Sequence, residues 1–406
     1  MRFTRRVICT LSALVAGYVC FAADPVLNLH DPLSNPGFVH FYNNEFDEAI
    51  IQFEKGVKAH PDDPESYNHL AQGILYREML RDGALESQLV GGTNPFLRRS
   101  KLAVSAQDKQ RFTSCVTQSV NLSQALLEKN PQDVHALYAL GVAHALRSNY
   151  SFLVEKAWVD ALHEATAARK INQQILEIQP GFVDARLLLG LHEYIVASLP
   201  FYMRALGVVA GFHGDKEGGI RQLEDVRRNG ILNRYDAEIV LAAIYRRERS
   251  PEKAIPLLRD VAARFPRNYL LRFEQVEMYS DLGDKKSALQ VLGQIDYLRR
   301  TGAPGYRNVA PAKIKYLRAN LLFWYGDLDP ALADLKQITG NGAAELDLKT
   351  AVMAWLRLGQ VYDLEGNHQE AIEAYRETMK TAPGSAAAME AKNYMSNPYH
   401  RKRLTG

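Results

Sequence analysis

The stretch WLRLGQVYDLEGNHQEAIEAYRETMKTAP, residues 355–383, constrains this chain most, because its apolar and small residues follow intervals that no single helix would produce. Its first part places four residues on one stripe of a helix with 3.6 residues per turn: Trp355, Leu358, Gly359 and Tyr362. Its second part repeats the i, i+4, i+7 spacing at Ala371, Tyr375 and Thr378, and Pro383 follows. The stretch therefore predicts two antiparallel helices.

Small residues explain how the two predicted helices pack. Gly359 and Ala371 let the paired backbones approach closely, while Trp355, Tyr362 and Tyr375 fill the space around that contact. One such pair leaves its outer apolar faces uncovered. It must therefore stack on further pairs of the same kind.

These residues resemble the 34-residue tetratricopeptide repeat, with Tyr375 in place of the usual Phe and Thr378 in place of the last Ala. Related positions recur along the chain, and Ala254 and Ala288 are 34 residues apart. We count about eight units between residues 33 and 383. The resemblance implies an all-α fold, a right-handed α-solenoid of about eight helix pairs with insertions in the central repeats.

The same pattern predicts the organisation of the chain. Residues 1–22 form a signal peptide, and residues 23–384 form the solenoid, with irregular repeats over 33–230 and more regular ones over 235–383. Residues 385–406 form a capping helix and a basic tail. Three irregular segments, 89–101, 198–214 and 299–311, are interpreted as insertions because the repeat spacing resumes after each.

The N-terminus has the features of a secretory signal. Three arginines precede the apolar run VICTLSALVAGYVCF, and Ala22 suits cleavage. A lipid anchor on Cys20 is disfavoured, because Tyr18 and Val19 are bulky where such sites prefer small residues. The run is too short for a bilayer span, so we expect a periplasmic or secreted protein with no transmembrane span in the mature chain.

Charge and cysteine content exclude some classes of partner. Removing the three signal arginines lowers Lys plus Arg from 49 to 46, which equals Asp plus Glu at 46, so nothing favours nucleic acid. Cys115 alone of three cysteines remains after cleavage, and we expect a packed core thiol.

No motif indicates an enzyme or a metal site. The segment LHEYIV begins like a zinc-protease helix, but Val196 stands where the second histidine would be needed. The glycine-rich segment GFHGDKEGG follows a predicted helix instead of a strand, and it lacks the Lys-Ser/Thr of a phosphate loop. We expect no catalytic residues, no metal and no cofactor.

The tetratricopeptide resemblance implies that the first helix of each pair lines a concave, partner-binding face. The positions that it assigns to this face are Tyr138, Leu191, Tyr194, Phe273, Glu277, Tyr316, Asn320 and Gln360. A chaperone-tail clamp is disfavoured, because Tyr316 stands where such repeats need Lys beside Asn320. The sequence thus predicts a protein-interaction scaffold of the bacterial envelope that binds a protein or peptide.

An alternative remains open for the central units. Apolar residues of the 198–214 insertion could cover the groove beside Leu191 and Tyr194, which would make the protein a carrier of a lipid or another apolar small molecule. The same residues could also simply pack as core.

Overall fold

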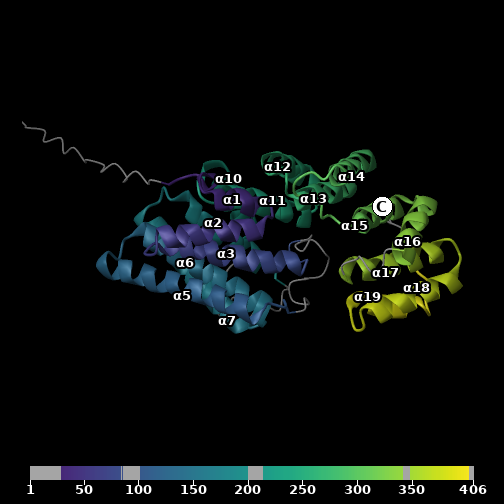
Figure 1. The fold of residues 1–406 in the computed structure, drawn as a ribbon, viewed down its shortest axis with the longest axis horizontal. Helices are drawn as coiled ribbons and strands as arrows, with labels where there is room; N and C mark the ends of the chain where they lie inside the picture. Colours follow the sequence, from purple (N-terminus) through teal and green to yellow (C-terminus); the bar gives the residue numbers. More distant parts are fainter. Residues whose placement is uncertain (1–28, 84, 86–100, 200–213, 342–347, 402–406) are drawn as a thin grey trace, which may run out of the picture.

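A computed structural model of the chain describes residues 29–83, 85, 101–199, 214–341 and 348–401, and these residues contain helices and turns but no β-strand. The longer helices are α1 (Pro36–Tyr42), α2 (Phe46–Ala59), α3 (Pro64–Arg81), α5 (Ala106–Lys129), α6 (Val134–Tyr150), α7 (Trp158–Ile178), α8 (Arg186–Ala197), α10 (Lys216–Asn229), α11 (Arg234–Arg247), α12 (Pro251–Arg264), α13 (Tyr269–Leu282), α14 (Lys285–Arg300), α15 (Pro311–Tyr325), α16 (Leu328–Asn341), α17 (Leu348–Leu364), α18 (His368–Thr381) and α19 (Ala386–Tyr394). Short turns of helix cover Pro32–Ser34, Ser151–Glu155 and Val183–Ala185. In this part of the chain the helices form eight pairs, α1/α2 to α17/α18, and α19 follows them (Figure 1). The all-α solenoid of about eight pairs is therefore confirmed.

Close backbone approach holds the last pair together. A Cβ added to Gly359 on α17 would lie 2.4 Å from the Tyr375 ring on α18, so only glycine fits there. Tyr375 is fully buried, and its hydroxyl donates to Asp363 Oδ2 at 2.7 Å. Ala371 is also fully buried in the same cluster. The small residues thus have the packing role that their spacing predicted.

Left-handed glycines follow the first helix in the last three pairs. Gly283 has φ +87°, and Gly326 and Gly366 have φ +88° and +81°. Residues with a Cβ rarely adopt this conformation, so glycine suits the turn from one helix to the next. After Gly283, Asp284 caps α14 by accepting a hydrogen bond from Ser287 N at 3.0 Å.

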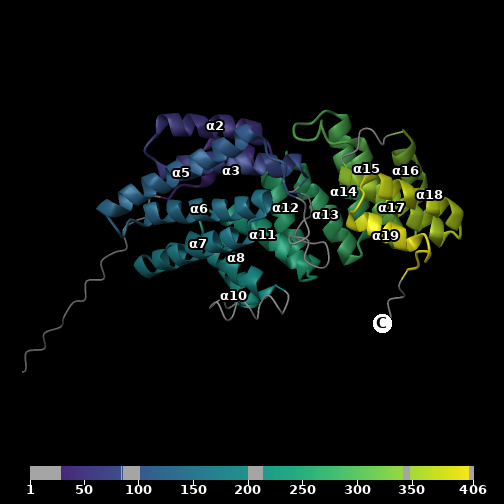
Figure 2. The same ribbon diagram turned by 90° about the horizontal axis from the view of Figure 1, so that it is seen from below.

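Each pair packs on the next, and α19 covers the end of the stack. The second helix of one pair contacts the first helix of the following pair along the whole described array. Ala387 and Ala391 of α19 join the core of the last pair, so the apolar face that α17 and α18 present at this end is not left open. Figure 2 shows α15 to α19 grouped at one end and α2 to α8 at the other.

The array also curls so that its first pair contacts the fifth and sixth, a closure that the repeat pattern did not predict. The Tyr42 hydroxyl at the end of α1 donates to Asp236 Oδ2 on α11 at 2.7 Å, and its ring stacks on Phe265 at 4.9 Å. Arg267 Nε donates to Glu45 Oε1 at 2.7 Å. We call this set of contacts, between residues 42–45 and 236–267, the N-terminal clasp.

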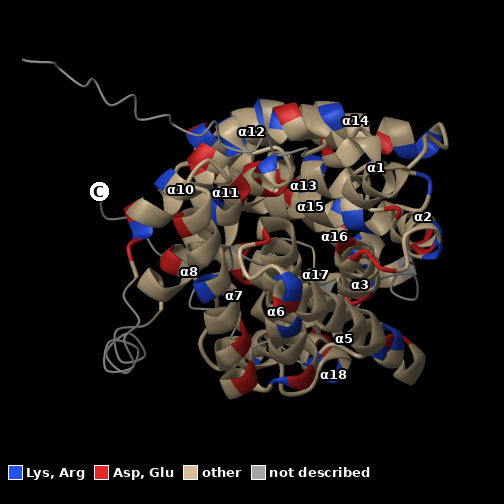
Figure 3. Cartoon of the chain, turned by 90° about the vertical axis from the view of Figure 1, so that its left-hand side faces the viewer, with Lys and Arg blue, Asp and Glu red and all other residues tan. Residues whose placement is uncertain are grey.

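Charged residues of both signs are mixed over the molecule. On the side seen in Figure 3, Lys and Arg are interspersed with Asp and Glu along the helices. This distribution agrees with the balanced charge of the sequence after residue 22.

Candidate partner-binding groove

Three aromatic residues that we predicted on the concave face lie inside the protein. Tyr138, Tyr194 and Phe273 are only 8%, 3% and 6% exposed. The Tyr138 hydroxyl is hydrogen-bonded to Asn233, and the Tyr194 hydroxyl donates to Glu248 Oε1 at 2.7 Å. The expected aromatic platform is therefore not formed by these rings. Positions that flank a buried stripe are covered by neighbouring helices here, and both tyrosine hydroxyls find internal partners.

Three other predicted residues are also largely enclosed. Leu191 and Tyr316 are partly buried against separate core clusters. Gln360 is 5% exposed, and its Oε1 accepts a hydrogen bond from Arg357 Nη1 at 2.7 Å. Gln360 thus holds Arg357 in place and presents little surface to a partner.

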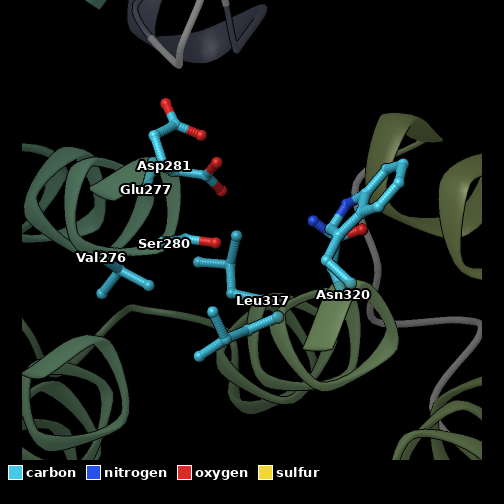
Figure 4. Close-up of a pocket in the computed structure, with 8 residues that line it drawn as sticks. Val276, Glu277, Ser280, Asp281, Leu317 and Asn320 are labelled. Carbon is cyan, nitrogen blue, oxygen red and sulfur yellow. The ribbon is translucent and has the colours of Figure 1, made fainter. Parts of the chain in front are cut away.

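Glu277 and Asn320, the remaining predicted residues, lie on facing helices around one cavity. Its volume is about 190 Å³, and it lies between α13 and α15. The residues that line it are Val276, Glu277, Ser280, Asp281, Leu317, Asn320, Leu321 and Trp324. Figure 4 shows Glu277, Ser280 and Asp281 on the α13 side, opposite Leu317 and Asn320 on α15. We call this space the α13–α15 groove.

The α13 wall of the groove is acidic and is organised by one arginine. Arg246 on α11 donates to Glu274 at 3.2 Å, to Glu277 at 2.9 Å and to Asp281 at 3.1 Å. The Arg246 side chain is 9% exposed, whereas those of Glu277 and Asp281 are 24% and 45% exposed. The carboxylates therefore face the groove, and the guanidinium lies behind them.

Burial and these contacts shift the pKa values of Glu277 and Arg246. Burial raises the pKa of Glu277 above its ordinary value, although the nearby Arg246 guanidinium opposes that shift. Glu274 and Asp281 add to the rise, because a further negative charge close by disfavours ionisation. Burial acts to lower the pKa of Arg246, but the surrounding carboxylates outweigh it and raise that pKa.

The α15 wall combines an amide with an exposed indole. Asn320 Oδ1 is buried and accepts no hydrogen bond from the described residues. Trp324, one helical turn further on, is 56% exposed. The Arg357 guanidinium lies 4.9 Å from the Trp324 ring centre and 4.1 Å from that of Phe323, which fixes the indole by a cation–π contact.

Sequence reasoning missed Asp281 and Trp324, although a signal was present. Asp281 is four residues after Glu277, and Trp324 is four residues after Asn320. Residues with that spacing share a helix face. Each predicted groove residue therefore had a neighbour of the same orientation one turn away.

The segment between α14 and α15 packs against the helices that form the groove. Tyr306 and Val309 of that segment are 1% and 6% exposed and pack into the core beside α13. Gly305, with φ +82°, lies so close to Arg267 that an added Cβ would be 2.0 Å from its carbonyl oxygen. Contact between α13 and α15 is slight, whereas α15 contacts α17 directly. The segment thus packs into the same core cluster as Val276 and Leu321, two residues that line the groove.

A family model for the tetratricopeptide repeat matches residues 316–386, which cover most of α15, the helices α16 to α18 and the start of α19. The glycine-mediated packing of α17 on α18 lies within this match. Residues 316–386 thus match the tetratricopeptide repeat family. Repeats of this family generally serve as non-catalytic scaffolds for protein–protein interaction.

The solved structures to which the chain is similar include tetratricopeptide repeat proteins. Yeast Tom70 has a TM-score of 0.41 at 13% identity, with 90% of this chain and 88% of that chain covered. A tetratricopeptide repeat protein from Parabacteroides merdae has a TM-score of 0.31 at 12% identity, with 83% and 99% covered. YrrB, a tetratricopeptide repeat protein with an unusual peptide-binding site, has a TM-score of 0.29 at 14% identity, with 67% and 97% covered. No curated protein sequence matches the chain.

The described residues lack two features. They contain no cluster of three or more His, Cys, Asp or Glu side chains with metal-binding geometry. None of their helices is long and apolar enough to cross a membrane.

Proposed function

We propose that this tetratricopeptide repeat protein is a scaffold that binds a segment of a partner protein through its concave face, in the α13–α15 groove. The observation that carries this proposal is the cavity of about 190 Å³ between two first helices, with Trp324 exposed at its edge. Exposed aromatic side chains often supply much of the binding energy at protein interfaces, because they bury a large area at low entropic cost.

The alternative of an apolar ligand has less support. Tyr194, which would have faced such a ligand, is buried and hydrogen-bonded to Glu248. The expected lid, residues 201–212, lies outside the described residues. The groove that is described is lined by acids, an amide and an indole, which suits a polypeptide better than a lipid tail.

We also propose that the protein acts in the bacterial envelope, in the periplasm or after secretion. Support comes from the arginine-rich start and the apolar run before Ala22, residues that lie outside the described part of the chain. N-terminal sequencing of the protein from the periplasmic fraction should begin at Ala23. A cytosolic protein that still starts at Met1 would contradict this location.

Position-specific photo-cross-linking tests the binding proposal. A photoreactive phenylalanine replaces Trp324 on the concave side or, as a control, Tyr297, which is 60% exposed on the second helix α14. After irradiation in cells, the position 324 variant should yield a discrete protein adduct that the position 297 variant lacks. Identical adducts from both positions, or an adduct only from 297, would contradict binding in the groove.

A further inference from the structure

The chain that follows α19 returns across the last helix pairs, and we call residues 395–401 the C-terminal strap. The Tyr399 backbone N–H donates to Asp363 Oδ2 on α17 at 2.7 Å, and the Tyr399 ring lies 6.0 Å from that of Phe323 on α15. The Arg401 guanidinium donates to the Phe323 carbonyl oxygen. The strap therefore joins the end of α19 to both α17 and α15.

One buried carboxylate anchors the strap. The Asp363 side chain is 0% exposed, and its oxygens meet the Tyr399 N–H, the Tyr375 hydroxyl at 2.7 Å and His368 Nδ1 at 2.6 Å. Burial and the hydrogen bond to Asp363 raise the pKa of Tyr375 above its ordinary value, so its hydroxyl remains a donor at neutral pH. The backbone amide also keeps its hydrogen. His368 is thus the one of these three donors that can lose a proton near neutral pH.

The second ring nitrogen of His368 faces another acceptor. Nε2 lies 3.3 Å from the carbonyl oxygen of Met395, the first residue of the strap. A carboxylate and a carbonyl only accept hydrogen bonds, and an imidazole carries hydrogens on both nitrogens only when it is protonated. Both contacts are therefore satisfied by the charged ring alone. In a neutral ring, one nitrogen would turn its lone pair towards an oxygen.

We propose that His368 is a pH-dependent latch, in which the protonated ring holds the C-terminal strap on the last helix pair and loss of the proton loosens it. The ring lies at the start of α18 and reaches Asp363 on α17 and Met395 at the end of α19, so three helices meet there. Both of these contacts hold the strap, because Met395 begins it and Asp363 binds its Tyr399 N–H. The latch acts independently of what the α13–α15 groove binds.

The sign of the pH dependence follows from the surroundings of the ring. The hydrogen bond to Asp363 raises the pKa of His368 above its ordinary value of 6.5, burial opposes this rise, and the charge of Asp363 and the Met395 carbonyl add to it. The dipole of α18 also opposes a cation at its first residue. Asp363 is the charged group that acts on this ring among the described residues of α17, α18, α19 and the strap.

A pKa that is raised in the folded state stabilises the contacts fully below the unfolded value, and this stabilisation is lost as pH rises through the folded value. The strap should therefore be held below pH 6.5, the ordinary pKa of His368, and loosen above the raised pKa of that ring.

Hydrogen exchange of the full chain, measured by mass spectrometry and divided by the intrinsic exchange rate at each pH, tests the latch. Protection of the strap should fall at least about fivefold between about pH 6 and about pH 8.5, while protection of α17 and α18 stays the same. Unchanged protection of the strap, or an equal loss in α17 and α18, would overturn the proposal.

Two variants assign the pH dependence to one ring. His368→Gln keeps a polar side chain that cannot take up a proton, so its strap should be poorly protected at both pH values. His400→Gln is the matched control, because it replaces an exposed histidine of the strap itself and should behave as the unmodified chain does. A loss of protection with pH that persists in His368→Gln would mean that another group titrates, and the proposal would be wrong.

NMR of the histidine rings gives a second readout. The His368 signals are assigned by their loss in His368→Gln, and at about pH 6 both ring nitrogens should carry hydrogens. The ring should then titrate over the same pH range in which the strap loses protection. A ring that is already neutral at about pH 6, or that titrates without any change in the strap, would overturn the latch.

Discussion

Replacing Gly359 by alanine should destabilise the last helix pair, although alanine is the better helix former. The new methyl would lie 2.4 Å from Cε1 and 2.6 Å from Cδ1 of Tyr375, distances at which the ring must move. Tyr375 cannot move freely, because it is fully buried and its hydroxyl is bonded to Asp363. Overpacking of this kind costs about 1–3 kcal/mol, and moving the ring would also weaken a hydrogen bond to a carboxylate.

Alanine also has a higher helix propensity than glycine, and this gain in stability partly offsets the cost of overpacking. Helix propensity favours alanine over glycine by about 0.5–1 kcal/mol. We therefore expect Gly359→Ala to lower the free energy of unfolding by about 1–2 kcal/mol. Gly293→Ala on α14 is the matched control, since a Cβ added there would meet no atom within 4 Å and only the propensity gain applies. That variant should be more stable by about 0.5–1 kcal/mol.

Urea unfolding followed by circular dichroism measures both variants. Because a repeat array can unfold in parts, hydrogen exchange of α17 and α18 should be measured as well as urea unfolding. Exchange in these two helices should be faster in Gly359→Ala and unchanged in Gly293→Ala. If Gly359→Ala were as stable as Gly293→Ala, the close contact between α17 and α18 would be refuted.

Further predictions concern the N-terminal clasp. Burial raises the pKa of Asp236 to about 6, so the folded state binds a proton more tightly than the unfolded state does, and this group lowers stability as pH rises from about 4 to 6. Asp236→Asn can still accept a hydrogen bond from the Tyr42 hydroxyl, so it should stabilise the protein by about 1–3 kcal/mol at pH 7 and by little at pH 4. A gain in stability that does not change with pH would contradict the raised pKa of Asp236. Arg267→Ala should speed hydrogen exchange in α1 and leave α17 and α18 unchanged, since it removes the ion pair to Glu45; equal effects at both ends would contradict a local clasp.

Much of the fold could be predicted because each repeat is a local unit. The spacing of Trp355, Leu358, Gly359 and Tyr362, followed by Ala371 and Tyr375, encodes one helix pair within a short stretch. Copies of that pattern then give the number of pairs. The clasp could not be predicted in this way, because it joins residues such as Tyr42 and Asp236 that are 194 positions apart.

The candidate site was harder to predict than the fold. Tyr138, Tyr194 and Phe273 have the same helical spacing whether they face solvent or a neighbouring helix, so the pattern does not distinguish the two positions. Glu277 and Asn320 were identified singly, each from its place beside a buried stripe. They come together across the space between α13 and α15, beside the segment around Tyr306, and no repeat pattern describes that segment.

Hydrogen–deuterium exchange with the partner recovered by cross-linking tests the central claim most directly. If a partner segment lies in the α13–α15 groove, adding the purified partner should slow exchange in Tyr269–Leu282 and Pro311–Tyr325. The second helices α12, α14 and α16 should exchange as before. Protection confined to those second helices, or to the N-terminal pairs, would contradict the account.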